Sequence, residues 1–264
     1  MSPVQHIGYA QLAIATLLVV FCGIISIGLQ LKLEKQLALG ATRTIVQLLI
    51  VGYVLQYVFK VRSPYIVVGL ALVMVGFATQ AAVGRSKLAY PGIRVQSFFT
   101  LTASGLLTSF VVTSAVIQVH PWYRAQYLIP LMGMILGNSL TGISIALDQL
   151  LSDLTERANF IEMELAHGAS AWEAARAPLH DAVRRGMIPT INGMMVVGIV
   201  SLPGMMTGQI LAGSDPIEAV KYQIVVMFML SAATALGCMT IVLLAYRKLF
   251  NSRHQLERGL IAKR

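Results

Sequence analysis

A run of thioether, hydroxyl and amide side chains surrounds a proline–glycine pair inside an apolar stretch of the sequence. The pair is Pro203-Gly204, and Met205 and Met206 follow it directly. Proline removes a backbone hydrogen bond and glycine loosens a helix, so we expect the helix to break here. In a membrane, such a break is tolerated where it lines a cavity or is buried in protein. Two interpretations of the methionines stay open: soft ligands that touch a metal, or side chains that fill irregular packing.

Neutral polar side chains, and not charged ones, mark the middle of the apolar stretches. The absence of Asp, Glu, Lys and Arg there counts against a transporter driven by an intramembrane proton relay. Amides and hydroxyls can bond one helix to another, or they can line a polar translocation path, and we keep both interpretations. The residues assigned to such a path are Asn138, Asn192, Ser201, Pro203, Gly204, Thr207 and Gln209.

Sequence signatures of catalysis are absent. The chain has no G-x-x-x-x-G-K-[ST] phosphate loop, no H-E-x-x-H metal motif and no G-x-S-x-G nucleophile elbow. Its five histidines are scattered. We therefore expect no catalytic residue, no cofactor and no metal site beyond the speculative Met205 and Met206. Any ATP that serves this chain would be bound by a partner.

The composition indicates a membrane protein. Of 264 residues, 56% are hydrophobic and only 12% are charged, against about 25% charged in soluble domains. The formal net charge of +9 is better explained by anionic lipid and membrane orientation than by nucleic acid. We expect an all-α integral membrane protein and a single polytopic transmembrane domain over residues 1–264.

Seven apolar stretches predict a bundle of about seven transmembrane helices. Their predicted bounds are Tyr9–Leu31, Thr44–Phe59, Pro64–Val83, Ser97–Val119, Gln126–Leu147, Ile188–Leu211 and Tyr222–Tyr246. With the N-terminus outside, sixteen Lys and Arg residues fall on the inner side and four on the outer side. The positive-inside rule therefore favours an outer N-terminus and a cytoplasmic C-terminus.

A long polar segment, residues 148–187, separates the fifth and sixth predicted spans. Apolar residues from Leu147 to Leu165 trace one helix face, so we expect the fifth span to continue into the cytoplasm as an amphipathic helix. Gly168 is suited to stop that helix. Ser170 and Glu173 fit a capping box for a second helix, and Pro178 favours a further helical start. The prediction is a compact cytoplasmic helical elbow.

The elbow carries a resemblance to a known family. Glu162-Met-Glu-Leu-Ala-His-Gly168 resembles the E-A-A-x-x-x-G loop of ABC transporter permeases, with Met163 and Glu164 departing from its two alanines. The stretches Ile188–Gly213, Asp215–Phe228 and Arg43–Gly52 resemble the FetB-like iron-export permease family (UPF0014-type membrane proteins). The resemblance covers essentially the whole chain.

Membership of that family would imply a permease whose ATPase is a separate polypeptide in a bacterial plasma (inner) membrane. Bacterial relatives are linked to iron export, and plant relatives to aluminium tolerance and, in one proposal, to nucleotide-sugar transport. The resemblance assigns contact with the ATPase to Glu162, Glu164, Leu165, Ala166, Gly168, Ala169 and Ser170, and a permease homodimer is expected. Two alternatives to metal export stay open. The chain could be a permease for a nucleotide-sugar or another organic solute, or a membrane scaffold that recruits an ATPase without transporting anything.

Overall fold

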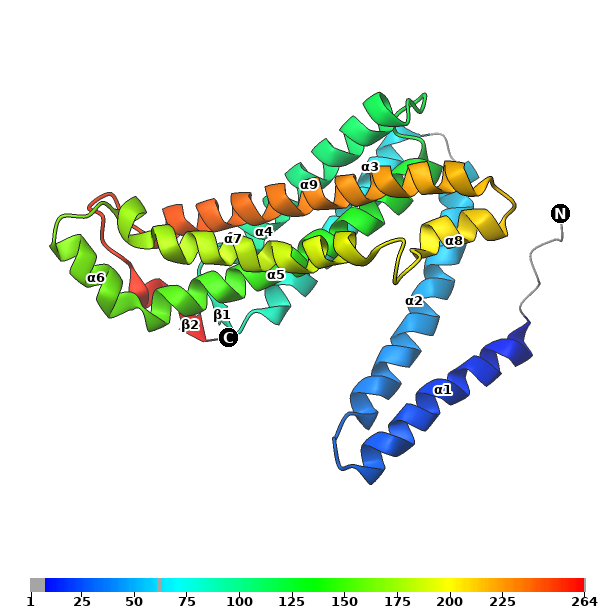
Figure 1. Ribbon diagram of the computed structural model, residues 1–264, viewed down its shortest axis with the longest axis horizontal. Coiled ribbons are helices and arrows are strands. Elements are labelled where there is room, and N and C mark those ends of the chain that lie inside the picture. The colour runs from blue at the N-terminus through cyan, green and yellow to red at the C-terminus, as the bar shows by residue number, and fades with distance from the viewer. Residues whose placement is uncertain (1–7, 61–62, 264) are drawn as a thin grey trace. The chain divides into compact units, whose positions relative to one another are not determined.

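The computed structural model describes residues 8–60 and 63–263, which are almost wholly helical (Figure 1). Arg62 and Arg264, which entered the count of inner and outer charges, lie outside the described residues, as do residues 1–7 of the predicted domain. The chain divides into two compact units. Unit 1 holds residues 1–62 with 211–213, and unit 2 holds residues 63–210 with 214–264.

Unit 1 is a helical hairpin of α1 (Tyr9–Gly28) and α2 (Glu34–Lys60). Ser26 organises the turn, because its hydroxyl accepts the backbone N–H of Leu33 at 3.0 Å and donates to Glu34 at 3.3 Å. The predicted second span, Thr44–Phe59, begins ten residues too late. Hydropathy marks only the apolar part of a helix, whereas Glu34 and its polar neighbours are good helix formers that extend it.

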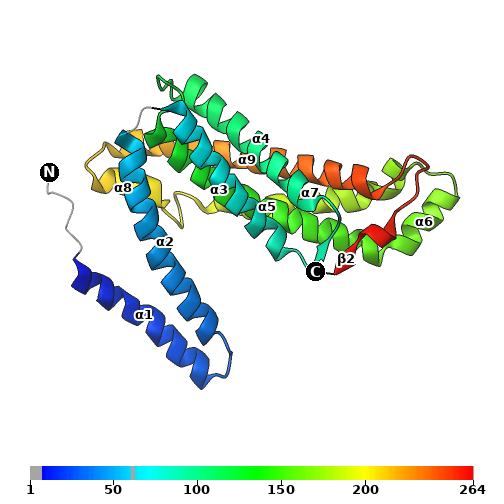
Figure 2. The same cartoon turned by 180° about the vertical axis from the view of Figure 1, so that it is seen from behind.

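Unit 2 is a bundle in which the long helices lie side by side (Figures 1 and 2). The central helix α5 (Ala125–Glu156) packs against α3 (Pro64–Arg85), α4 (Ile93–Val111), α7 (Ala171–Val196) and α9 (Pro216–Leu249). A π-helical turn, Val112–Val116, prolongs α4. The largest fully buried side chains come mainly from α5, which is therefore the core of the unit: Leu128, Met132, Ile135, Ile143, Leu147, Leu150, Leu151 and Leu154.

Short elements complete one end of unit 2. They are α6 (Ala158–Ala166), a 3₁₀ turn at Arg258–Leu260, and two strands, β1 (Leu88–Ala89) and β2 (Ala262–Lys263). The strands pair antiparallel, with Leu88 opposite Lys263 and Ala89 opposite Ala262. This pairing attaches the C-terminal segment to the connection between α3 and α4.

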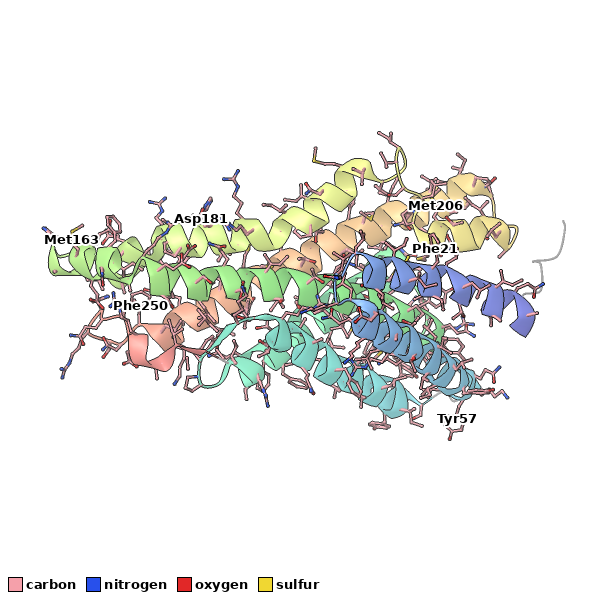
Figure 3. The ribbon with its side chains drawn as sticks, turned by 90° about the horizontal axis from the view of Figure 1, so that it is seen from below. Phe21, Tyr57, Met163, Asp181, Met206 and Phe250 are labelled. Carbon is pink, nitrogen blue, oxygen red and sulfur yellow. The ribbon has the colours of Figure 1, made fainter. Side chains whose placement is uncertain are left out.

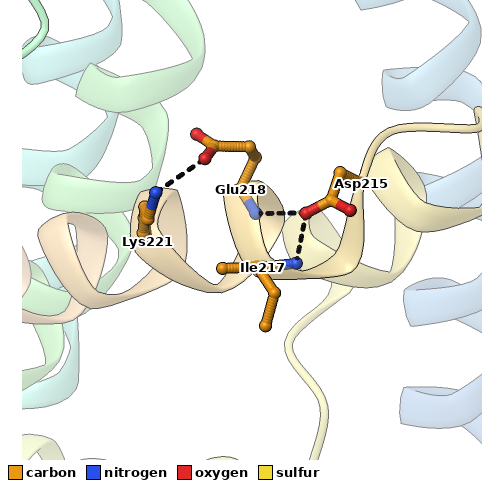
Figure 4. Close-up of polar contacts among 4 residues, drawn as sticks. All are labelled: Asp215, Ile217, Glu218 and Lys221. Atoms are coloured by element: carbon orange, nitrogen blue, oxygen red, sulfur yellow. Dashed lines mark hydrogen bonds and ion pairs between the residues drawn. The ribbon is translucent and has the colours of Figure 1, made fainter.

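The last helix, α9, is longer than the predicted span Tyr222–Tyr246, and the polar contacts at its start explain why it begins earlier. Asp215 Oδ1 accepts the N–H groups of Ile217 at 2.9 Å and Glu218 at 3.2 Å, and Lys221 binds Glu218 at 2.7 Å (Figure 4). A capping aspartate followed by Pro216 at the first helical position is a strong helix start. The helix thus begins in polar sequence, before the apolar stretch that hydropathy detects.

Six helices in the described residues are long and apolar enough to cross a membrane: α1, α2, α3, α4 with its π-helical turn, α5 and α9. The predicted sixth span, Ile188–Leu211, is divided between α7 and α8 (Gly204–Leu211). The Trp172 ring lies 5.5 Å from that of Tyr246, so α7 begins beside the end of α9. Helix α7 packs against α9, but neither α7 nor α8 is among the helices that have the length and hydropathy of a membrane span. The described residues thus contain six candidate spans, whereas the sequence predicts about seven.

Candidate functional site

The elbow between α5 and α7 has the turn that the sequence predicts, but the predicted continuous helix from the fifth span to Leu165 is wrong, because non-helical backbone at Arg157 separates α5 from α6. Helix α6 ends at Ala166, and Gly168 adopts a left-handed backbone with φ of +95°. The N–H groups of Gly168 and Ala169 donate to the carbonyl oxygens of Leu165 and Glu164, each at 3.1 Å. A left-handed glycine that closes a helix in this way confirms the predicted stop.

The capping box at the start of α7 is also present. Ser170 Oγ accepts the N–H of Glu173 at 3.3 Å, and the Glu173 carboxylate accepts the N–H of Ser170 at 2.8 Å and its hydroxyl at 2.6 Å. The hydroxyl bond, followed by the backbone bond, lowers the pKa of Glu173 below its ordinary value. Ser170 is thus fixed as the first residue of the returning arm.

The predicted new helical start at Pro178 is wrong, because α7 runs unbroken from Ala171 to Val196 with Pro178 and Pro189 inside it. Proline costs a helix one hydrogen bond. The packing of a continuous buried face, which includes Ala175, Pro178 and Leu179, offsets that loss. The returning arm of the elbow is consequently one continuous helix that leads into the bundle.

Large apolar side chains are exposed around the elbow. Phe160 and Met163 on α6 are 55% and 49% exposed, and Trp172 at the start of α7 is 48% exposed. Figure 3 shows Met163 near the tip of the elbow, at the opposite end of unit 2 from Met206. Exposed apolar groups gathered on a polar protrusion are typical of a protein contact surface.

Two grooves flank α6. One, of about 530 Å³, lies between α6 and α7 and is lined by Phe160, Glu164, Arg176 and Asp181, among others. The other, of about 580 Å³, lies between α6 and the C-terminal segment, where Leu165 and Ala166 face His254 and Leu256. Of the predicted ATPase-contact residues, Glu164 lines the first groove, and Glu162, Leu165 and Ala166 line the second.

Glu162 does not have the free carboxylate that we expected to pair with the ATPase. Its Oε1 lies 3.0 Å from Nε of Arg258, near the end of the same chain. No local sequence pattern predicts this contact, because it joins residues far apart in the chain. Of the two acidic residues assigned to the ATPase contact, only Glu164 has no ion pair among the described residues.

The residues assigned to a translocation path lie on α5, on α7, in the break after α7 and on α8. Asn138 and Asn192 are exposed, and Asn138 donates to the carbonyl oxygen of Met134 at 3.1 Å. Thr207 donates to the carbonyl oxygen of Pro203 at 3.1 Å, whereas Gln209 Oε1 is buried and has no hydrogen-bond partner among the described residues. In the same part of the chain, no side-chain hydrogen bond joins these four residues to one another.

The expected helix break is confirmed. Helix α7 stops at Val196, a tight turn joins Gly198 N–H to the Ser201 carbonyl oxygen at 2.9 Å, and Gly204 opens α8. Met205 packs against an apolar cluster of α5 and α9 that includes Leu131, Val226 and Met229. These apolar neighbours favour a packing role for Met205 over metal binding.

The comparisons with known proteins cover nearly the whole chain. The model of the Uncharacterised protein family (UPF0014) matches residues 9–250. The chain belongs to this family. The probable iron export permease protein FetB of Escherichia coli (strain K12) is 37% identical over 253 residues, 96% of each chain. A UPF0014 membrane protein of Synechocystis, slr1647, is 38% identical over 226 residues, 86% of this chain and 87% of the relative.

The UPF0014 family also includes plant proteins. ALUMINUM SENSITIVE 3 of Arabidopsis thaliana is 30% identical over 250 residues, 95% of this chain and 90% of the relative. No solved structure matches the chain. Membership of a family of membrane proteins agrees with the multi-pass membrane protein that the apolar stretches predict.

Sequence reasoning missed a buried row of hydroxyl groups in this UPF0014 member. Helix α4 buries Ser97, Thr100, Ser104 and Thr108 in the bundle. The hydroxyls of Ser97 and Thr100 have no hydrogen-bond partner in the described part of the chain. Their spacing of three and four residues, which places them on one helix face, was the available signal.

Proposed function

We propose that this chain is the membrane-spanning subunit of an ABC exporter that moves iron or another metal with ATP hydrolysed by a separate ATPase subunit. The observation that carries the proposal is the elbow at the end of the bundle, where Phe160 and Met163 are exposed on the short helix α6 and Trp172 is exposed at the start of α7. The name of the Escherichia coli relative, a probable iron export permease, supports the metal substrate.

The elbow is built to transmit movement. Helix α5 is continuous from the bundle to Glu156, and α7 is continuous from Ser170 back into the bundle. A helix that inserts into a cleft of the ATPase would therefore act on two rigid arms. The left-handed turn at Gly168, where a Cβ would meet open space, keeps the end of α6 slim enough to enter such a cleft.

The remaining parts of the proposal concern assembly and orientation. Two copies would form the permease in the lipid bilayer of a bacterial inner membrane, with the N-terminus outside and the C-terminus in the cytoplasm. The exporter needs no cofactor on this chain and no nucleic acid. No group of three or more His, Cys, Asp or Glu side chains suited to a metal occurs among the described residues, so a metal substrate would pass along neutral oxygen groups.

The test is reconstitution of the chain with its ATPase in proteoliposomes, with the affinity of the two proteins and metal export as readouts. Replacing Met163 by Ala should weaken ATPase binding roughly tenfold, because buried anchors of an interface contribute most of its energy. Met195→Ala is the matched control, since Met195 is 73% exposed on α7 away from the elbow and should leave binding unchanged.

The alternatives give different results in the same system. A scaffold would bind the ATPase without any transport, and an organic-solute exporter would move a nucleotide-sugar and not a metal. Equal binding by wild-type and Met163→Ala chains would contradict docking through the elbow.

A further inference from the structure

The segment after α9 folds back and binds the elbow. Arg258 Nε lies 3.0 Å from Oε1 of Glu162, and Arg258 Nη2 donates to Oδ1 of Asn159 at 2.7 Å. At the start of α7, the N–H of Ala171 donates to Nδ1 of His254 at 3.1 Å. Both arms of the elbow are therefore bound to one segment of chain, residues 251–263, which we call the strap.

The strap has its own internal order. Asn251 Oδ1 accepts hydrogen bonds from the N–H groups of Arg253 and Gln255, each at 3.0 Å. The N–H of Glu257 donates to the carbonyl oxygen of Leu249 at 2.8 Å. The side chain of Leu256 is buried. At its far end, the strap pairs with β1 as strand β2. A segment anchored before and after Arg258 holds that guanidinium at a fixed place.

Helix α6 packs against α5 and α7 over a small part of its surface, so it needs such support. Only Ala158 and Ile161 of its nine residues are buried. Non-helical backbone at Arg157 separates α6 from α5, and the left-handed turn at Gly168 follows it. Asn159 and Glu162 are three residues apart and so lie on the same face of α6. A single arginine that binds both therefore resists rotation of α6 about its axis.

We propose that the strap positions α6 for the ATPase and that Arg258 is the positioning residue. The inference rests on the proposed function, since it concerns the same docking helix. Arg258 keeps the exposed face of α6, with Phe160 and Met163, in the orientation that the partner binds. Without Arg258, the partner has to select that orientation from a mobile helix, and the apparent affinity falls by the fraction that is correctly oriented.

Hydrogen exchange of α6 and ATPase affinity, measured on the full-length chain in lipid nanodiscs, test the inference together. Arg258→Gln should speed exchange of the α6 amides by roughly twofold to fivefold, the range expected for loss of a part-exposed ion pair. ATPase affinity should fall by a similar factor. The matched control is Arg247→Gln, since Arg247 is exposed near the end of α9 and forms no ion pair among the described residues.

A double mutant separates pairing from other roles of Glu162. If Glu162 acts through Arg258, Glu162→Gln should add nothing to exchange in the Arg258→Gln chain. Additive effects, unchanged exchange in Arg258→Gln, or faster exchange with unchanged ATPase affinity would each overturn the positioning role. Failure of the wild-type chain to bind any ATPase is a separate result, because it overturns the proposed function itself.

Discussion

Gly142 of α5 and Gly186 of α7 lie against each other where the two helix backbones come into contact. A Cβ on Gly186 would lie 2.8 Å from the carbonyl oxygen of Gly142, and a Cβ on Gly142 would lie 3.0 Å from the carbonyl oxygen of Gly186. The Cys238 side chain of α9 lies at the same contact, and a Cβ on Gly186 would lie 2.9 Å from its Sγ atom. Glycine is therefore required sterically at both positions, on the two helices that carry the elbow.

Gly186→Ala should destabilise the bundle by about 1–3 kcal/mol, the usual cost of overpacking a core. Most of that cost comes from backbone that has to move apart. Thermal unfolding in detergent measures it. Gly193→Ala on the same helix is the control, because a Cβ there meets nothing within 4 Å. An equal loss of stability in both variants would contradict the steric explanation.

The capping box should make the elbow sensitive to acid. The pKa of Glu173 is lowered by its bonds with Ser170, so its contribution to stability is present above the unfolded-state pKa. That contribution is lost as the pH falls through the lowered folded-state pKa. The fluorescence of the neighbouring Trp172, in a Trp122→Phe chain, should report the loosened turn as the buffer becomes acidic. A Glu173→Gln chain should show no such transition.

Gln209→Leu should reduce metal export roughly tenfold, which corresponds to about 1.4 kcal/mol, without lowering stability. The reason is that Gln209 Oε1 is buried and unpaired in the described structure, so a passing substrate is the partner that we propose for it. Radioactive metal efflux from proteoliposomes is the measurement. Met205→Leu is the companion variant, because Met205 packs in an apolar cluster and its replacement should leave export intact.

Thr234 offers a separate test of the buried hydroxyls. The residue is fully buried on α9, and its hydroxyl has no hydrogen-bond partner among the described residues. Thr234→Val keeps the shape and removes the unpaired oxygen, so thermal stability should be unchanged or higher. Thr234→Ala leaves a small cavity and should cost about 1 kcal/mol. Lower stability in the valine chain would show that the hydroxyl is paired.

The glycine pairs show what a sequence pattern leaves open. Gly133-xxx-Gly137 and Gly204-xxx-Gly208 match a motif for close helix approach, either within the chain or at a homodimer seam, and within the described chain a Cβ on Gly137, Gly204 or Gly208 would meet nothing within 4 Å. The real contact joins Gly142 to Gly186, which no local motif links. Glycines four residues apart leave one face of a helix without side chains, but only the tertiary structure decides whether another helix packs against that face.

The sequence by itself determined the membrane class, the helical elbow, the turn at Gly168, the capping box of Ser170 and Glu173, and the break before Gly204. Each depends on residues within a few positions of one another, where backbone geometry and hydropathy act locally. The tertiary structure decided that Glu162 binds Arg258, that α7 continues through Pro178, and that hydroxyls of α4 are buried. These outcomes depend on packing between segments that are far apart in the chain. Such contacts can outweigh the local conformational preferences that are visible in the sequence.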